Sequence, residues 1–428
     1  MLRRPRTGWL TAVSLAAVSM IGLGRAVVPA DDVVSLAVPG RANSTPWVAA
    51  SGSFVAVAWG AGATGKTDVF VAVSRDGART FASPVQVNAT AGEARLGGEM
   101  PPRIVLRARD SGDPEMVVLW TARGESTAIR TARSIDGGKT FSAAAALQAA
   151  GAPGDRGWPA LTLDAHGTAH AIWLDHRGLA RPAGEPAHNH HEGTNADGVA
   201  MAQKSGLYYA SSSTQASPER ALAMGVCYCC KTAIVAGADG SLFAAWRHVY
   251  EGNLRDIAFS ASRDGRTFST PVRVSKDDWA INGCPDDGPA MMVDGAGTIH
   301  IVWPTVVGGP TPEGAIFYAS SRDGKSFSDR VRVPTLGSPK PSHPQIAIDA
   351  RGRIVVAWDE AVNGQRVAAM REVRHSSSGV SFGEPRMLAA QGPAVYPVLA
   401  ATSSGFVAAW TAGTGESSAI AVRALTLQ

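Results

Sequence analysis

The sequence has few cysteines, no pattern of long amphipathic helices, and no second long apolar run after its N-terminus. Cysteine occurs four times in 428 residues, and all four copies fall between positions 227 and 284. The missing helical pattern argues against an α/β enzyme with a helix-covered parallel sheet. The missing second apolar run argues against a membrane span in the mature chain, because a spanning helix needs about 20 such residues.

The first 30 residues have the composition of a secretory signal peptide. Three arginines stand among the first six residues, an apolar run extends from Leu10 to Leu23, and small residues precede Asp31. We therefore expect export, to the periplasm or the medium, with cleavage near Ala30. Residues 31–428 would then form a single domain.

A basic surface for nucleic acid is also absent once this leader is set aside. The leader holds four of the 40 basic side chains and no acid, which leaves 36 basic against 36 acidic residues. A nucleic-acid-binding domain would show a clear basic excess. We expect a monomer whose partner is a sugar, another small molecule or a metal ion.

What the chain does contain is a tryptophan that recurs at similar spacing. The seven copies, 52 to 73 residues apart, are Trp59, Trp120, Trp173, Trp246, Trp303, Trp358 and Trp410. Each ends a short apolar strand that follows a breaker, often proline, and a turn containing Gly or Asp, as in 159–173 and 344–358. Repeats of this period with several strands each indicate propeller blades. The pattern predicts an all-β fold, a single β-propeller of four-stranded blades, with tryptophans in its core.

The ends of the repeat predict how the ring closes. The seventh unit is followed by one further strand only, Ser418–Leu425, and the segment Val33–Val38 is a spare strand at the N-terminus. If this spare strand completes the last blade, no unpaired edge remains. This closure predicts seven blades with both ends of the domain in one blade.

A second motif recurs after most tryptophan strands. It reads Ser-x-Asp-Gly-x-x-Thr-Phe at 74–81 and 134–141, and shorter versions occupy 262–268 and 321–327. Asp accepts hydrogen bonds from nearby backbone N–H groups and Gly supplies positive φ, so these are turns. The expected structural aspartates are Asp76, Asp136, Asp264 and Asp323.

These turns resemble the Asp-box (BNR) repeat of the sialidase superfamily, and the repeated frame covers roughly residues 43–425. The resemblance implies the propeller fold and places the turns on the face away from the active site. It implies activity only weakly, because the same hairpin occurs in propellers that are not sialidases. Sialidases have six blades, so six is the alternative to the seven counted above.

The resemblance also implies a set of catalytic candidates at the mouth of the central channel. In the family a Tyr polarised by a Glu attacks the sugar and an Asp acts as acid/base, which points to Tyr396, Glu360 and Asp175. Three arginines hold the substrate carboxylate, and the candidates are Arg103, Arg177 and Arg247. Packing of Tyr396 at a blade edge and ion pairs of these arginines, such as Arg103 with Glu99, are alternative roles.

The cysteines suggest a different function for the same region. They lie in two successive loops that enter inner strands, and histidines of neighbouring loops are expected close to them. Two disulfides are one interpretation for an exported chain, although a bridge between the adjacent Cys229 and Cys230 would be strained. Thiols beside imidazoles also suit Cu or Zn. The metal candidates are Cys227, Cys229, Cys230, Cys284, His176, His190 and His248.

Three hypotheses follow from these patterns. The first is an exported sialidase-like propeller whose Cys/His/Asp cluster binds a metal or a small ligand. The second is an exo-glycosidase of the exo-α-sialidase type that removes sialic acid or a related acidic sugar. The third is a propeller that serves only as an interaction scaffold.

Overall fold

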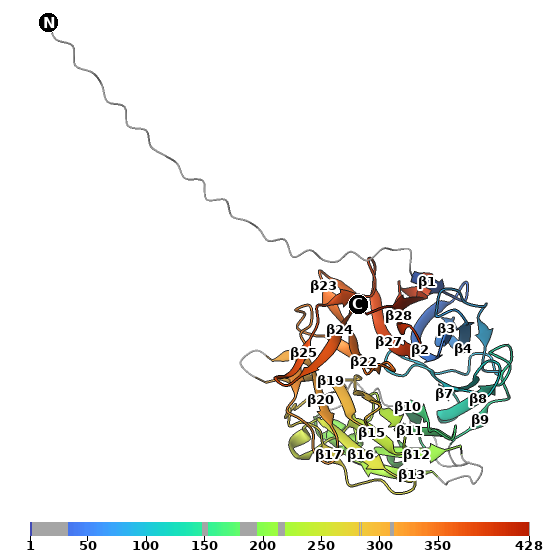
Figure 1. The fold of residues 1–428 in the computed structure, drawn as a ribbon. Helices are drawn as coiled ribbons and strands as arrows, with labels where there is room; N and C mark the ends of the chain where they lie inside the picture. The colour runs from blue at the N-terminus through green and yellow to red at the C-terminus, as the bar shows by residue number, and fades with distance from the viewer. Residues whose placement is uncertain are drawn as a thin grey trace.

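The chain folds into a ring of seven β-sheets. The computed structural model describes residues 33–147, 153–179, 195–212, 219–281, 283, 285–308 and 312–427, besides Met1. Each sheet is a blade whose strands follow one another from the centre outward (Figure 1). The inner strands of successive blades contact each other around the whole ring, from β2 through β6, β10, β14, β18 and β22 to β27 and back to β2. The predicted seven-bladed all-β propeller is therefore confirmed.

Within each blade the first strand named is the innermost one. Blade one is β2 (Ala42–Ser51), β3 (Phe54–Ala63), β4 (Lys66–Ser74) and β5 (Val85–Gln86); blade two is β6 (Arg103–Arg107), β7 (Glu115–Ala122), β8 (Ala128–Ser134) and β9 (Ala145–Ala146). Blade three is β10 (Arg156–Leu163), β11 (Ala169–Asp175), β12 (Gly206–Ser211) and β13 (Arg220–Met224); blade four is β14 (Ala233–Ala236), β15 (Leu242–Arg247), β16 (Ile257–Ser262) and β17 (Val272–Arg273). Blade five is β18 (Ala290–Val293), β19 (Ile299–Val307), β20 (Glu313–Ser321) and β21 (Val331–Arg332). Blade six is β22 (Ser342–Ile348), β23 (Ile354–Val362), β24 (Gln365–Ser376) and β25 (Gly379–Phe382), with β26 (Arg386–Met387) also paired to β24. Blade seven is β27 (Ala394–Thr402), β28 (Gly405–Ala412), β29 (Ala419–Leu425) and β1 (Val33–Leu36).

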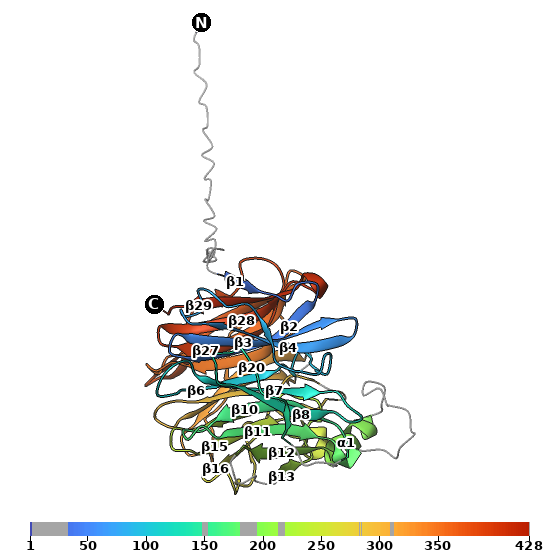
Figure 2. The same ribbon diagram turned by 90° about the vertical axis from the view of Figure 1, so that its right-hand side faces the viewer.

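Helices are few and peripheral in the described part of the chain. The α-helix α1 (Asn195–Lys204) contacts β13 at the edge of blade three, where Figure 2 shows it projecting from the ring. Short 3-10 turns occupy Arg177–Leu179, Glu251–Asn253 and Gly415–Ser417. None of the described helices is long and apolar enough to cross a membrane. The expected signal peptide falls on residues outside the described part, apart from Met1.

The core lies between the blades, and the repeated tryptophans form it. All seven are at most 1% exposed. Trp120 of blade two packs with Val69 and Val71 of blade one, and Trp59 of blade one packs with Val398 and Val407 of blade seven. Each tryptophan thus joins its own blade to the preceding one. The apolar face of a blade can be buried only against the neighbouring blade. A sheet that cannot bury both faces alone must stack on a neighbour, which explains the repeat.

The N-terminal strand closes the ring as predicted. β1 pairs antiparallel with β29, with Val33 opposite Arg423 and Leu36 opposite Ile420. Leu36 is 6% exposed and belongs to the same apolar cluster as Trp59. In Figure 1 the blue and red ends of the domain lie side by side in this blade. Without β1, blade seven would have three strands and an exposed outer edge on β29; β1 pairs with this edge.

A recurring bulge opens the inner strand of four blades. The register skips two residues opposite the tryptophan, and the skipped pairs are Thr45-Pro46, Trp158-Pro159, His343-Pro344 and Tyr396-Pro397. The first residue of each pair has φ between 48° and 56°. Such a left-handed backbone is uncommon for residues other than Gly and is costly, so it persists only where the surrounding structure holds it. These bulges lie on the face where the inner strands begin, which we call the axial face.

The aspartate turns lie on the opposite face. In the turn of blade two, Asp136 accepts hydrogen bonds from the Ser134 hydroxyl (2.8 Å), the Lys139 and Thr140 amides (3.0 and 3.1 Å) and the Thr140 hydroxyl (2.6 Å). Asp76, Asp264 and Asp323 have corresponding contacts in their own blades. The hydrogen bond from Thr140 is the largest cause that lowers the pKa of Asp136, to about 2.

Replacing Asp136 with Ala is expected to lower the free energy of unfolding by about 1 kcal/mol, because the turn amides lose their acceptor. The pKa of Asp136 is lowered by folding, so its stabilisation exists above the unfolded pKa of Asp and disappears as the pH falls through the folded pKa. Urea unfolding of both proteins at neutral and acidic pH measures this difference. Asp329→Ala, at an exposed position, is the control. An equal loss in both variants would contradict the assigned role.

Candidate functional site

Six ionisable or polar side chains from five blades meet on the axial face. Glu99 precedes β6, Lys231 precedes β14, Asp287 precedes β18, His343 and Tyr396 occupy bulges of β22 and β27, and Asp359 lies in β23. They lie in loops that enter an inner strand, at the start of an inner strand, or directly after a blade tryptophan. The propeller topology therefore gathers residues that are up to 297 positions apart in the sequence.

The centre of this group is a buried lysine between two carboxylates. Lys231 Nζ lies 3.0 Å from Glu99 Oε2 and 3.6 Å from Asp287 Oδ1, and the three side chains are only 3%, 6% and 10% exposed. Lys231 also donates to the carbonyl of Pro344 (3.3 Å). Charges this deep in a protein persist only when paired, so the three groups depend on one another.

A histidine held by an aspartate borders this pair. His343 Nδ1 lies 2.7 Å from Asp359 Oδ2, and the opposite nitrogen, Nε2, lies 3.9 Å from Glu99 Oε1. The amide of His343 donates to Asp287 (2.6 Å), so both ring and backbone are positioned by carboxylates. Asp359 additionally pairs with Arg366. The Nδ1 contact orients the ring and leaves Nε2 as the nitrogen available for proton transfer.

Tyr396 covers the histidine. The two ring centroids are 4.2 Å apart, and the Tyr396 amide donates to the same Asp359 oxygen that binds His343 (2.7 Å). The phenol also crosses Gly98, where a Cβ atom would lie 2.2 Å from the Tyr396 hydroxyl. Gly98 is thus required for the tyrosine to reach this position.

The site shifts the pKa values of its three acid–base groups. Burial raises the pKa of Glu99, with Asp287 adding to the rise and Lys231 opposing it. Burial alone would lower the pKa of His343, but the hydrogen bond to Asp359 and the carboxylates of Glu99 and Asp287 raise it overall. Burial, with smaller effects of Glu99 and Asp359, raises the pKa of Tyr396 to about 12. Such shifts in one cluster are typical of functional sites.

Only part of this cluster can be touched from outside. Tyr396 and the His343 ring are partly exposed, whereas Glu99, Lys231, Asp287 and Asp359 are buried. The two rings line a small hollow with Trp47 and Gln345, and Glu99 and Lys231 form part of its wall. The hollow has a volume of only about 10 Å³, so a ligand larger than water would lie over the two rings, with the charge network behind them.

The three arginines proposed from the sequence are engaged separately. Arg103 donates to the Pro159 carbonyl (2.8 Å) with its guanidinium 3.7 Å from the Trp47 ring centroid, and Arg247 donates to the carbonyls of Arg255 and Pro304 (both 2.7 Å). Both are buried, and burial lowers the pKa of each to about 10. Among the described residues, no hydrogen-bond or ion-pair partner is shared by any two of these arginines. The structure therefore does not bring them together around one carboxylate.

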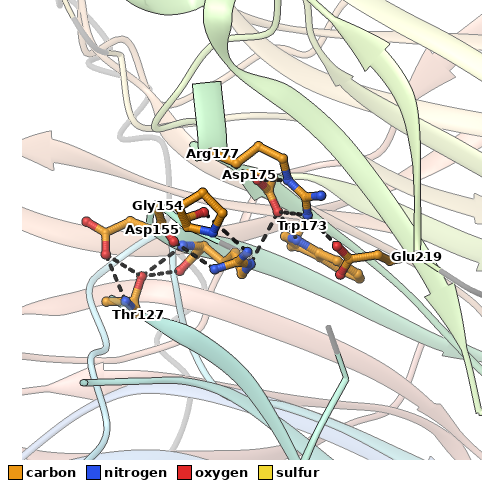
Figure 3. Close-up of polar contacts among 9 residues, drawn as sticks. Thr127, Gly154, Asp155, Trp173, Asp175, Arg177 and Glu219 are labelled. Atoms are coloured by element: carbon orange, nitrogen blue, oxygen red, sulfur yellow. Dashed lines mark hydrogen bonds and ion pairs between the residues drawn. The ribbon is translucent and has the colours of Figure 1, made fainter. Parts of the chain in front are cut away.

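Arg177 and Asp175 bind each other in blade three. Figure 3 shows Asp175 between the guanidinium of Arg177 (2.8 and 2.9 Å) and the indole of Trp173 (3.1 Å). Arg177 continues to Glu219 (2.5 Å), and Arg156 approaches Asp175 from the other side (3.3 Å). The Asp175 side chain is fully buried. These contacts tie the end of β11 to β10 and to the start of β13.

Glu360 and Tyr396, proposed as a pair, are not in contact in the described structure. Glu360 accepts hydrogen bonds from the amides of Leu336 and Ser338. Its neighbour Asp359 is the residue that reaches Tyr396. The carboxylate that shares the hollow with the Tyr396 ring is Glu99.

The cysteines lie beside this site. Cys227 and Cys230 form a disulfide, Cys229 is also disulfide-bonded, and the segment is buried, with exposures of 0% to 5%. The three sulfurs lie within 4.8 Å of one another, and neither His176 nor His248 belongs to this group. His176 instead lies near the Trp158 ring (6.1 Å), and His248 against Tyr250 (4.7 Å). The other two candidates, Cys284 and His190, are outside the described residues.

A second cavity of about 240 Å³ adjoins the cysteines. Trp158, Tyr228, Cys229 and Met100 line it, with Arg95 and Asp155 among its polar residues. It is separated from the Tyr396 hollow by residues 95–101, which contribute to both. The axial face thus has two adjacent depressions.

Only Tyr396 of the six side chains in this site was among the candidate residues. Lys231 directly follows the cysteine triplet, and His343 stands in an X-Pro pair, as does Tyr396. The recurring X-Pro pair at the start of an inner strand is a sequence signal that would have found His343. Nothing in the sequence around Lys231 indicates that its amine is buried.

The comparisons with known proteins concern the fold. No family model and no curated protein matches the sequence. A PL25 ulvan lyase bound to a GlcA–Rha3S saccharide matches with TM-score 0.57 at 9% identity, over 89% of this chain and 94% of that one. The GH93 α-L-arabinofuranosidase of Fusarium graminearum, complexed with arabinobiose, matches with TM-score 0.50 at 10% identity, over 92% and 97%.

A third solved structure is the Hadza microbial sialidase Hz136, with TM-score 0.48 at 16% identity, over 85% of this chain and 74% of that one. At these identities the likeness shows the fold alone. The predicted propeller fold is supported by the first two matches, and no particular protein is identified.

Proposed function

We propose that this protein is a sialidase-like glycoside hydrolase whose reacting groups are Tyr396, His343 and Glu99. The observation that carries the proposal is the partly exposed His343–Tyr396 pair, stacked at 4.2 Å over the buried Glu99–Lys231 ion pair. A structural network would not need its two titratable rings at the open side of the cluster.

In the proposed reaction, Tyr396 is the nucleophile. A phenol with a pKa of about 12 attacks only if a base takes its proton. Glu99 lines the same hollow, and burial raises its pKa, which makes it a stronger base once ionised. Glu99 therefore takes the role that the family resemblance implied for Glu360.

His343 is the proton donor in this proposal. Its raised pKa favours the imidazolium, and its Nε2 is the nitrogen not held by Asp359. It would protonate the glycosidic oxygen of the leaving group while Tyr396 attacks the anomeric carbon. It would then assist water in releasing the glycosyl group from Tyr396. This replaces Asp175, whose side chain is fully buried and bonded to Arg177.

Carbohydrate as the substrate class has support from the solved structures of the same fold. Two of them are named as a polysaccharide lyase and an arabinofuranosidase. Because the three candidate arginines are separately engaged, we propose a sugar whose recognition does not depend on a three-arginine carboxylate site. We also propose export with cleavage near Ala30, which N-terminal sequencing of the secreted protein would test.

The test is product analysis with purified protein. Fluorogenic glycosides, including sialosides and arabinofuranosides, are offered first, followed by neutral and acidic polysaccharides. Hydrolysis adds water and yields a new reducing end, whereas elimination yields an unsaturated sugar that absorbs in the ultraviolet. Release with water addition supports the proposal. If no substrate is cleaved, the proposed hydrolase function is wrong. Unsaturated products would show that Tyr396 is not the nucleophile.

The pH profile of kcat/KM is expected to be bell-shaped. Activity should rise as Glu99 loses its proton, at a pH above the usual range of Glu, and fall as His343 loses its proton, above the usual range of His. His343→Asn keeps a residue that tolerates φ near +56° and should remove the alkaline limb along with most activity. An unchanged alkaline limb in this variant would exclude His343 as the donor.

A further inference from the structure

The cysteine segment carries an arrangement that the proposed hydrolysis does not use. The three sulfur atoms of Cys227, Cys229 and Cys230 lie within 4.8 Å of one another in a buried pocket. Cys227 Sγ and Cys229 Sγ are 4.0 Å apart. In a tetrahedral zinc–thiolate site with Zn–S bonds of ~2.3 Å, neighbouring sulfurs are about 3.8 Å apart. The backbone therefore already holds two sulfurs at nearly the separation that a metal would require.

A buried arginine faces these sulfurs. Arg255 is fully buried, its Nη1 lies 3.6 Å from Cys227 Sγ, and its Nε donates to the Asn253 side chain (3.2 Å). Among the described residues its Nη2 has no hydrogen-bond partner, and no described carboxylate pairs with it. The guanidinium also lies 6.0 Å from the Tyr228 ring. This buried cation therefore has no described carboxylate to balance it.

An unbalanced buried charge is expensive, and a disulfide sulfur is neutral and cannot offset it. A cysteine thiolate at the same place would carry the missing negative charge. Arg255 is thus complementary to the reduced form of the segment rather than to the disulfide. Three thiolates, one divalent cation and one guanidinium sum to zero charge, whereas a monovalent cation would leave one buried negative charge.

We propose that, in the reduced protein, Cys227, Cys229 and Cys230 bind one divalent thiophilic cation of the Zn(II) class, with Arg255 as the buried counter-charge. A dithiol reductant supplies two electrons to the Cys227–Cys230 bond, becomes a cyclic disulfide and leaves two thiols. The disulfide of Cys229 is reduced in the same way by a second equivalent. Metal binding then releases the three thiol protons to solvent.

The experiment uses the full chain, reduced and kept without oxygen, with Zn(II) alone as the probe. Elemental analysis after dialysis is expected to give about one Zn(II) per chain for the reduced protein and none for the oxidised protein. Co(II) in place of Zn(II) should show thiolate-to-cobalt charge transfer, which reports sulfur ligation directly. Cys229→Ser should abolish this band.

Arg255→Gln should weaken Zn(II) binding by roughly 10- to 100-fold, the range for groups that support a metal site. Arg266→Gln, at an exposed turn position, is the matched control and should bind as the parent does. Equal affinity of both variants, Co(II) binding without charge transfer, or uptake of Cu(I) but not Zn(II) would each overturn the proposal. Circular dichroism follows the fold throughout, and a reduced protein that unfolds and does not recover with Zn(II) would overturn it as well.

Discussion

Tyr396→Phe is expected to lower kcat/KM by roughly three orders of magnitude or more, because the attacking oxygen is removed. The ring that stacks on His343 at 4.2 Å remains, and so does the amide hydrogen bond to Asp359. The variant should therefore fold like the parent and still bind substrate. Steady-state kinetics on the best substrate, together with a thermal unfolding curve, measure both parts.

Tyr208→Phe is the matched control for this variant. Tyr208 lies in β12 of blade three and supports the Arg177 guanidinium through its ring, 4.0 Å away, which the substitution preserves. Its activity should equal that of the parent. Retained activity in Tyr396→Phe would show that the hydroxyl is not the nucleophile, and the proposed mechanism would then be wrong.

The second large effect concerns stability. Lys231→Met should reduce the free energy of unfolding by about 3–5 kcal/mol, the cost of leaving buried charges without their partner. Glu99 and Asp287 would face each other with no described lysine between them, at 6% and 10% exposure. Urea unfolding at neutral pH measures the loss, and Lys325→Met at an exposed turn position serves as control.

The double variant Lys231→Met/Glu99→Gln separates electrostatics from packing. Neutralising Glu99 removes one of the two unpaired charges, so part of the stability should return, and the two single effects should not add. If Lys231→Met costs no more than its exposed control, the ion pair contributes little and the cluster is less interdependent than its geometry indicates. A double variant no more stable than Lys231→Met would instead assign the loss to packing.

The fold was largely predictable from the sequence because each blade repeats the same packing problem. A tryptophan that must cover the preceding blade marks every unit, so the seven regularly spaced tryptophans, out of eleven in the chain, count the blades. The spare N-terminal strand was predictable for a related reason, since the last unit lacked a strand and an unpaired edge is unfavourable. Both inferences depend on backbone pairing and burial, which the residue pattern expresses directly.

The site was predictable only in part, because it depends on which way single side chains point. In a propeller, the starts of the inner strands and the ends of the tryptophan strands share one face, which is where Glu99, His343, Asp359 and Tyr396 lie. Topology could not decide between Asp359 and Glu360, because successive strand residues point to opposite sides. The bulge at His343 shifts the register opposite this strand, and no sequence pattern reveals that shift.

The arginines failed to assemble for another physical reason. A long side chain can reach backbone carbonyls as easily as a ligand, and Arg103 and Arg247 do so in the core. Lys231, in contrast to these arginines, binds two carboxylates. Its long side chain is buried and held between Glu99 and Asp287. Sequence spacing carries no information on either choice, since both depend on which partner lies within reach after the ring has closed.

The X-Pro bulge has a consequence for how this face can change over evolutionary time. Four blades carry the same backbone feature, yet the residue before proline is threonine, tryptophan, histidine or tyrosine. The backbone conformation is thus independent of the identity of the side chain that it presents. A mutation there can alter the chemistry offered at the ring axis while the tryptophan layer beneath keeps the blades together. Such a ring can acquire a new specificity one blade at a time without first solving a new folding problem.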